Sequence, residues 1–278
     1  MLYIVMLKIK IITFIKSISM SGFLFHETVF GPVMSRRLGV SLGINLLPVD
    51  YKYCTFNCVY CECGWTHKKP EGGGGLPGRQ EVKELLEKKL KSLKENGQAP
   101  DAITFAGNGE PTIHPDFPEV IKDTISLRDQ YYPESKITVL SNASMLHRKQ
   151  VFDALLSVDN NIQKLDAGSE KVFQLINQAA GKLTLGQVVE QLCLFSGKLI
   201  VQTLFLRGSH NGTFIDNTTD DEIEAWIKLL IKINPEYVMI YSIDRATPEQ
   251  DLQKISFEKL SEIAEIVNRA GIKTKVFG

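Results

Sequence analysis

Three cysteines lie close together in the segment Cys54-Thr-Phe-Asn-Cys58-Val-Tyr-Cys61. Thiolates are soft ligands that suit zinc or an iron–sulfur cluster, and at this spacing three sulfurs can surround one metal centre from a single loop. The chain has 5 cysteines, and an odd number packed this closely argues against a secreted disulfide framework. The cysteine pattern therefore predicts a metal site in a reducing, cytoplasmic compartment.

The identity of the metal stays open on this pattern alone. Cys63 or His67 could supply a fourth ligand and close a tetrahedral zinc site. A 4Fe–4S cluster with three protein ligands would instead leave one iron open to a small molecule. We expect Cys193, which lies in an apolar helical segment, to belong to the core.

A second candidate site is the stretch Gly107-Asn108-Gly109-Glu110, which directly follows a short apolar segment. A backbone with few Cβ atoms can approach a ligand closely, and Glu110 could attract a positive charge or brace the loop. A tight turn without a ligand is the alternative. Because active sites of βα barrels gather at the carboxyl ends of the strands, we expect a ligand here.

Alternating strand-like and helix-like segments must position these residues. The sequence predicts strands at 41–47, 102–106, 137–140, 162–167, 198–206, 237–241 and 272–276. It predicts helices at 81–95, 115–127, 147–157, 169–178, 185–195, 222–233 and 257–269. Repeated βα units predict a parallel sheet with outer helices. We therefore expect an α/β fold, a partial (β/α)6-type TIM barrel, as one domain over residues 20–278.

Several local signals mark the ends of these helices. Gly97 suits a C-terminal cap, Thr219 with Glu222 forms a capping-box pattern, and Ser256 suits an N-terminal cap. The glycine run 72–75 predicts a flexible loop after the cysteines, either a linker or a lid.

The first nineteen residues are apolar and basic. Lys8, Lys10 and Lys16 interrupt the apolar run below the roughly 20 residues that a membrane-spanning helix needs. We expect residues 1–19 to be an N-terminal extension upstream of a native start at Met20, and we expect no membrane association. An extra strand or helix on the barrel, or a helix at a membrane surface, are the alternatives.

The cysteine spacing, with an aromatic residue directly before Cys61, resembles the radical S-adenosylmethionine (SAM) superfamily. The resemblance implies that Cys54, Cys58 and Cys61 hold one 4Fe–4S cluster whose open iron is chelated by the amino and carboxylate groups of SAM. It also implies that Tyr60 lies near the adenine. Gly107, Asn108, Gly109 and Glu110 resemble the family's glycine–glycine–glutamate stretch, which holds the SAM ammonium.

Polar residues after later strands are further candidates that this resemblance implies. Ser141 and Asn142 match a position that contacts the SAM ribose or carboxylate, although Asn142 could simply cap the following turn. Arg207 is a candidate for the SAM carboxylate, because a guanidinium gives a fixed fork, or else for a structural ion pair. Other candidates, for the rim of the barrel at the carboxyl ends of the strands or for the substrate pocket, are Lys164, Asp166, Gln202, Thr203, Tyr241, Asp244 and Arg245.

The resemblance implies an enzyme that takes one electron from a flavodoxin- or ferredoxin-type carrier. SAM then yields methionine and a 5′-deoxyadenosyl radical, which abstracts hydrogen from a substrate. Two other kinds of protein stay open on the residues alone. One is a zinc-stabilised binding protein, and the other is a non-enzymatic iron–sulfur electron carrier.

The segment GPVMSRRLGVSLGINLLP and the run CVYCECGWT resemble a narrower group, which includes the wybutosine tRNA-base-forming enzymes and spans Phe23 to the C-terminus. Those enzymes carry a second cluster on upstream cysteines, and here no cysteine precedes Cys54. We therefore do not expect their tRNA reaction. An RNA base, a peptide and a small metabolite stay open as substrates, and a net charge of zero gives no footprint for nucleic acid. Ser35, Arg36 and Arg37 could contact SAM or an anionic substrate, or form a solvated basic turn.

Overall fold

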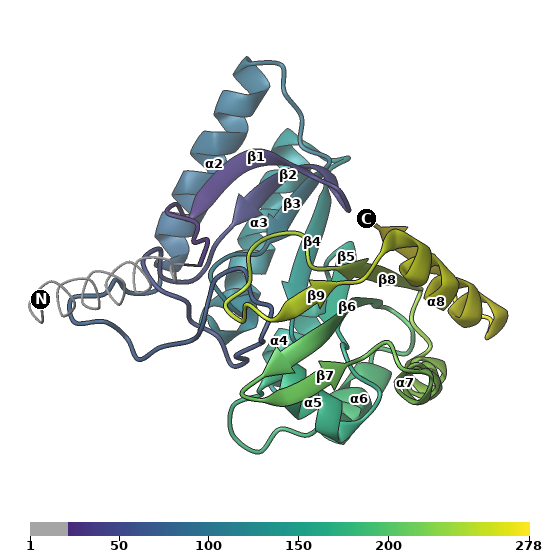
Figure 1. Cartoon of the computed structure of the whole chain (residues 1–278). Coiled ribbons are helices and arrows are strands. Elements are labelled where there is room, and N and C mark those ends of the chain that lie inside the picture. The colour runs from purple at the N-terminus through teal and green to yellow at the C-terminus, as the bar shows by residue number, and fades with distance from the viewer. Residues whose placement is uncertain (1–21) are drawn as a thin grey trace, which may run out of the picture.

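The computed structural model describes residues 22–278, and a curved, mainly parallel sheet forms its centre (Figure 1). The strand order is β1-β2-β3-β4-β5-β6-β8-β10; β2 to β10 along this path are parallel neighbours, and β1 is antiparallel to β2. The strands on this path are β1 (Val29–Ser35), β2 (Gly39–Ile44), β3 (Ala102–Phe105), β4 (Lys136–Ser141), β5 (Asn160–Lys164), β6 (Ile200–His210), β8 (Tyr237–Ser242) and β10 (Thr274–Phe277). This sheet agrees with the partial barrel that the sequence predicts. The predicted extension, residues 1–19, lies outside the described residues.

The helices pack their apolar faces against the sheet. They are α2 (Arg79–Glu95), α3 (Phe117–Tyr131), α4 (Lys149–Leu155), α5 (Glu170–Asn177), α6 (Leu185–Cys193), α7 (Asp220–Ile233) and α8 (Phe257–Arg269). In α2, for example, Val82, Leu86, Leu90 and Leu93 are buried at helical spacing, in one core with strand residues such as Ile103. Each helix of the described chain is too short or too polar to cross a bilayer.

The caps follow the predictions with one exception. Gly97 has a φ of +64° just after α2, and the Ser256 side chain accepts a hydrogen bond from the Lys259 N–H. The Thr219 hydroxyl likewise accepts from the Glu222 N–H. The Glu222 carboxylate does not return to Thr219, however; it accepts from the N–H groups of Gly168 and Ser169, at 2.9 and 3.2 Å. Glu222 therefore fixes the loop after β5 and leaves the capping box half formed.

Two short strands that the sequence analysis does not predict extend β6 beyond the sheet. β7 (Thr213–Asp216) and β9 (Leu252–Lys254) both pair antiparallel with β6. The turn between β6 and β7 is Asn211-Gly212, with φ values of +49° and +74°. An Asn-Gly pair between β-rich segments is a strong hairpin signal, so this hairpin could have been found from the sequence.

The two edge strands of the sheet, β1 and β10, are bridged by side chains. The turn between β1 and β2 places Arg36 within 3.1 Å of the Asp244 carboxylate, and Arg36 also donates to the carbonyl oxygen of Gly278. Figure 1 accordingly has the C-terminus close to the end of the β1–β2 hairpin. The opening of the partial barrel is therefore narrowed by the hairpin turn, and this brings its arginines toward the interior.

Candidate active site

The three predicted cluster ligands line a single cavity. Cys54, Cys58 and Cys61 face a volume of about 220 Å³ that is also lined by residues at the carboxyl ends of β4, β5 and β8. The loop that carries them is tied down by backbone hydrogen bonds, including Asn57 N–H to the Asn177 carbonyl at 3.0 Å and Val59 N–H to the Ile176 carbonyl at 2.9 Å. The three cysteines thus line one space, and their role as metal ligands stays a prediction.

The glycines of the second motif allow two loops to pack together. Gly109 has a φ of +143°, and a Cβ at this position would lie 1.9 Å from the carbonyl oxygen of Tyr53. A Cβ on Gly107 would lie 2.3 Å from the Asn45 side-chain oxygen. Both glycines line the cavity with their backbone. Their lack of a side chain is required first by the neighbouring loop, since Tyr53 and Gly109 form a β-bridge beside Cys54.

We expect Gly109→Ala to destabilise the protein by about 3 kcal/mol or more, because the new methyl group meets backbone rather than a flexible side chain. The measurement is chemical denaturation under anaerobic conditions. Gly186→Ala is the matched control: Gly186 lies in α6 with only the Thr184 hydroxyl near its Cβ position, at 3.9 Å. This control should be neutral or slightly stabilising. Equal stability of the two variants would contradict the loop-packing argument.

Glu110 braces the neighbouring loop. One carboxylate oxygen accepts from the Thr112 N–H at 3.1 Å, and the other accepts from the Asn142 N–H at 2.6 Å. Burial raises the pKa of this carboxyl group. Asn142 in turn donates to Thr55 at 3.0 Å and lies 3.6 Å from the Cys54 sulfur, while its side-chain oxygen accepts from the Ser144 N–H. Asn142 therefore caps a turn and also lines the cavity, and its contact with SAM stays a prediction.

Lys52 places a positive charge beside the cysteines. It is not among the site residues predicted from the sequence. It is buried, and its ammonium donates to the Gly64 carbonyl oxygen at 3.0 Å. Burial opposes the charge of Lys52, but the adjacent thiolates of Cys61, Cys58 and Cys54 outweigh burial and raise its pKa. Its position two residues before Cys54 was the available signal. A buried cation beside three thiolates favours the deprotonated form that metals bind.

The thiols themselves differ. Burial and the Glu110 carboxylate raise the pKa of Cys54 to about 12. A hydrogen bond from Cys63 lowers the pKa of Cys61 to about 5, and the same contact raises the pKa of Cys63. Cys63 lines the cavity and lies 3.5 Å from the Gly107 carbonyl oxygen. A metal that binds Cys54 must therefore displace its proton, as thiolate coordination requires.

Tyr60, Lys164 and Asp166 form a polar cluster at the wall of the cavity. The Tyr60 hydroxyl donates to the Asp166 carboxylate and accepts from the Lys164 ammonium, which lies 3.4 Å from Asp166. Burial and the Asp166 charge raise the pKa of Tyr60 well above its ordinary value. Asn177 links this cluster to the metal loop, since its amide donates to Asp166 at 2.8 Å and lies 3.5 Å from the Cys58 sulfur. Lys164 is therefore held by Asp166 at the cavity wall.

We expect Asp166→Asn to cost about 3–5 kcal/mol of stability, because it leaves the buried Lys164 ammonium without its counter-charge. Thermal unfolding, followed anaerobically, measures this. The control is Asp153→Asn, because the Asp153 ion pair with Lys149 lies on the exposed surface of α4 and contributes about 0.5 kcal/mol. A loss at position 166 as small as at position 153 would rule out the assigned role of Asp166.

Two of the predicted SAM contacts are not brought to the cavity. The Asn108 side chain is fully buried and bonds the backbone of Phe25 and Pro48 instead. Arg207 is exposed on the part of β6 that pairs with β7 and β9. The structure does bring in Ser141, Gln202, Tyr241 and Arg37. His67 is exposed and does not line the cavity.

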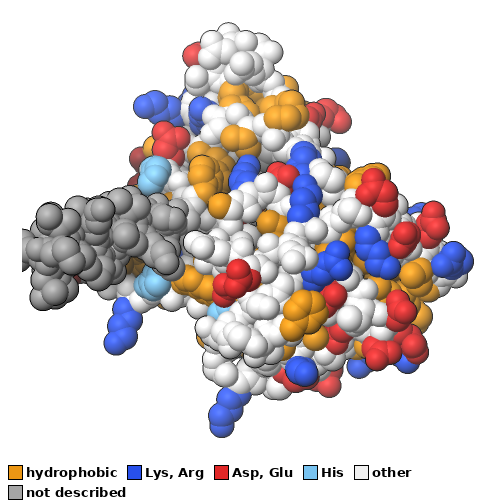
Figure 2. Space-filling view, viewed as in Figure 1, with side chains coloured by type: hydrophobic (Ala, Val, Ile, Leu, Met, Phe, Trp, Pro, Cys, Tyr) orange, Lys and Arg blue, Asp and Glu red, His pale blue; other side chains and the backbone are white. Residues whose placement is uncertain are grey.

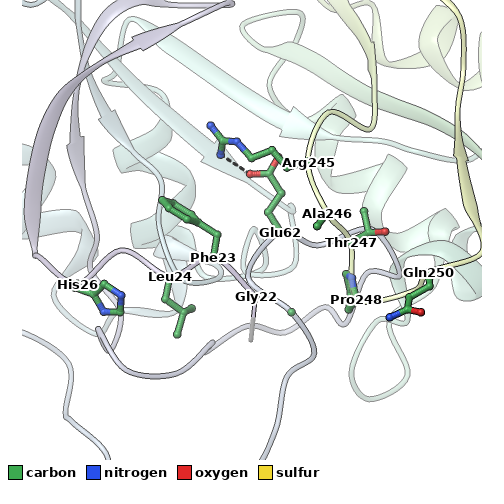
Figure 3. A pocket seen from close by; sticks show the side chains of 11 residues that line it. Gly22, Phe23, Leu24, His26, Glu62, Arg245, Ala246, Thr247, Pro248 and Gln250 are labelled. Atoms are coloured by element: carbon green, nitrogen blue, oxygen red, sulfur yellow. Dashed lines mark hydrogen bonds and ion pairs between the residues drawn. The ribbon is translucent and has the colours of Figure 1, made fainter. Parts of the chain in front are cut away.

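Two further cavities lie beside the cysteine cavity and share lining residues in series. A middle cavity of about 240 Å³ shares Arg37, Tyr60, Cys61 and Tyr241 with the first. An outer cavity of about 470 Å³ shares Glu62, Arg245 and Thr247 with the middle one. Figure 3 shows the outer cavity, where Arg245 is paired with Glu62 at 2.6 Å. The three cavities therefore adjoin one another in the order cysteine, middle and outer.

Comparison with known proteins identifies the class of this site. Residues 49–230 match the radical SAM superfamily. The chain therefore belongs to the radical SAM superfamily: it is an enzyme of the class that uses SAM and an iron–sulfur cluster. This confirms the enzyme prediction over the two alternatives, the binding protein and the non-enzymatic electron carrier.

Relatives of the chain include UPF0026 proteins. It is 30% identical to a UPF0026 protein of Methanocaldococcus jannaschii over 251 residues, 89% of this chain and 73% of that protein. It is also 30% identical over 240 residues to a Brachyspira hyodysenteriae protein named GTPase Obg, of whose length this chain spans only 33%. The UPF0026 match places the chain in that group.

Solved structures confirm the fold. A radical SAM methyltransferase from Sphaerobacter thermophilus matches with a TM-score of 0.62 at 15% identity, over 85% of this chain and 65% of that one. Archaeal TYW1 matches with a TM-score of 0.52 at 13% identity, over 83% of this chain and 72% of that one. At these identities the likeness concerns the fold, the partial barrel that the sequence predicts.

Proposed function

We propose that Cys54, Cys58 and Cys61 hold one 4Fe–4S cluster, and that the enzyme reductively cleaves SAM to act on its substrate by radical chemistry. The single observation that carries this is the convergence of the three thiols with the Gly107–Glu110 loop on one cavity. When bound, the cluster and SAM would supply methionine and a 5′-deoxyadenosyl radical after one electron from a flavodoxin- or ferredoxin-type donor.

The donor set fits this cofactor. Three soft sulfur donors face one cavity, and the buried Lys52 ammonium offsets their negative charge. Among the described residues, no three His, Cys, Asp or Glu side chains are grouped closely enough to hold a single metal ion. A cluster is larger than an ion, so its ligands can stand farther apart.

The residues around the cavity have separate roles in this proposal. The backbone of Gly107 and Gly109, with Ser141 and Asn142, binds SAM beside the cysteines, and Glu110 holds the Asn142 loop in place. Tyr60 lines both the cysteine cavity and the middle cavity, so its side chain can form one wall of the space for the adenosyl group. The partly enclosed walls exclude water from a reactive radical.

The substrate side lies toward the middle and outer cavities. On the face drawn in Figure 2, basic and acidic side chains are interspersed, without a uniform basic surface for a nucleic-acid backbone. This favours a small molecule or a peptide over an RNA strand.

The test is anaerobic reconstitution with iron and sulfide, followed by SAM and a reductant. We expect close to four irons and four sulfides per chain and the release of 5′-deoxyadenosine and methionine, measured by mass spectrometry. A colourless protein with one bound zinc and no sulfide would overturn the proposal.

A further inference from the structure

We propose that Arg37 binds a carboxylate or phosphate group of a small substrate, at the boundary between the cysteine cavity and the middle cavity. This rests on the proposed function, because it takes the middle cavity as the substrate side of the site. Arg37 lies in the turn of the β1–β2 hairpin and lines both cavities.

The other cationic side chains that line the cysteine and middle cavities face groups of the protein. Lys52 faces the cysteine thiolates, and Lys164 faces Asp166 at 3.4 Å. The two arginines beside the middle cavity also have partners: Arg36 pairs with Asp244 at 3.1 Å, and Arg245 pairs with Glu62 at 2.6 Å. Each of these four cations therefore has an acidic or thiol partner within the protein.

Arg37 differs from all four. Within residues 22–278, no carboxylate lies at ion-pair distance from its guanidinium. Its one side-chain hydrogen bond in that part of the chain is to a neutral group, the Gln202 amide oxygen, at 3.0 Å. A guanidinium has five N–H donors, so most of them are left for a ligand. An anion in either cavity would supply the missing charge.

The Arg37 side chain is also preorganised at the cavity wall. The Arg37 guanidinium lies over the Tyr241 ring at 4.5 Å from the centroid, and the Tyr241 hydroxyl donates to the same Gln202 oxygen at 3.3 Å. These two contacts hold a planar fork in one orientation at the cavity wall. Because its orientation is already fixed, the guanidinium loses little conformational entropy when it binds an anion through two oxygen atoms. Carboxylate and phosphate groups both bind in this way.

SAM could in principle use this arginine through its own carboxylate, so the experiment must fill the cofactor site first. The reconstituted protein is saturated with S-adenosylhomocysteine, which has the same carboxylate but no sulfonium to cleave. The cluster is photoreduced with a deazaflavin in chloride buffer, which avoids competing oxyanions. Inorganic phosphate and ¹³C-labelled acetate are then added separately, and their NMR line widths report how close each anion comes to the paramagnetic cluster.

We expect phosphate, acetate or both to be broadened in the wild type, and this broadening to fall about fivefold or more in Arg37→Gln. Arg37→Lys should keep part of it, and Arg207→Gln, an exposed arginine outside the cavities, should keep all of it. Broadening of phosphate alone or acetate alone identifies the anionic group.

Two results would overturn the proposal: no broadening in the wild type up to about 50 mM anion, or equal broadening in Arg37→Gln, whether or not that variant also loses affinity for S-adenosylhomocysteine. Equal broadening with such a loss would assign Arg37 to the cofactor. Iron and sulfide content and 5′-deoxyadenosine release, measured on the same wild-type preparation, separate these results from failure of the proposed function itself.

Discussion

Replacing Cys54, Cys58 or Cys61 singly by alanine is expected to abolish cluster loading and to reduce SAM cleavage by more than about 100-fold. Loss of a residue that merely orients a metal ligand costs 10–100-fold, so loss of a ligand should cost more. All three thiols line one cavity. Each substitution would leave one iron of the cluster without its sulfur ligand. Iron and sulfide analysis and 5′-deoxyadenosine release measure the two effects.

Two cysteine variants serve as controls. Cys193→Ala, in α6 and away from the cavity, should load a full cluster and cleave SAM as the wild type does. Cys63→Ala should also load a cluster, because three ligands remain, although it removes the hydrogen bond that lowers the pKa of Cys61. If Cys63→Ala lost its cluster while Cys54→Ala kept one, the assignment of ligands would have to change.

The second large effect is expected at Lys52. Reduction would add a negative charge to the proposed cluster, and we expect the buried ammonium of Lys52 to stabilise that charge. A unit charge about 6 Å away at an effective dielectric of about 20 contributes roughly 3 kcal/mol. Lys52→Met should therefore lower the reduction potential by on the order of 100 mV. Anaerobic redox titration, followed by the paramagnetic signal of the reduced cluster, measures it.

Lys69→Met is the matched control, because Lys69 is exposed in the loop after the cysteines and its charge is screened by water. Lys52→Arg should recover most of the potential, since it keeps the charge. If Lys52→Met held a full cluster at the wild-type potential, the electrostatic role given to Lys52 would be refuted.

Taken together, the cation positions suggest how one site separates two tasks. Lys52 lies beside the cysteines, where we expect it to act on the electron that would enter the proposed cluster. Arg37 lies at the boundary with the middle cavity, where we propose that it binds the substrate. Tyr60 and Lys164 line the same cavity, and the Lys164 charge is paired with Asp166. Variants on the two sides should therefore affect potential and substrate binding separately.

Local sequence signals predicted the parts of the site that lie within one loop. Cys54 and Cys58 are separated by three residues, and Cys58 and Cys61 by two. This short spacing brings the three side chains to one loop without any contact to a distant segment. Gly107 and Gly109 were likewise predicted to be important because they are glycines. The sequence suggested that a ligand approaches them closely. In the structure, the neighbouring residues Asn45 and Tyr53 are what exclude a side chain at these positions.

The choice between two arginines depended on tertiary structure. Strand prediction ended β6 near residue 206, which would put Arg207 at the mouth of the barrel. In the structure β6 continues to His210 because β7 and β9 pair with it, so Gln202 lines the cavity while Arg207 lies five residues, roughly 16 Å, farther along the strand. Arg37 reaches the cavity only because the hairpin turn folds across the opening of the sheet.

The sequence by itself determined the order of βα units, their buried faces and the three cysteines, because these depend on spacing within short segments. Only the tertiary structure decided which cations face the cavity and which are already neutralised. Those properties depend on how far each strand extends past its neighbours and on which acids come from distant loops, such as Asp244 beside Arg36 and Glu62 beside Arg245. No local pattern contains that information.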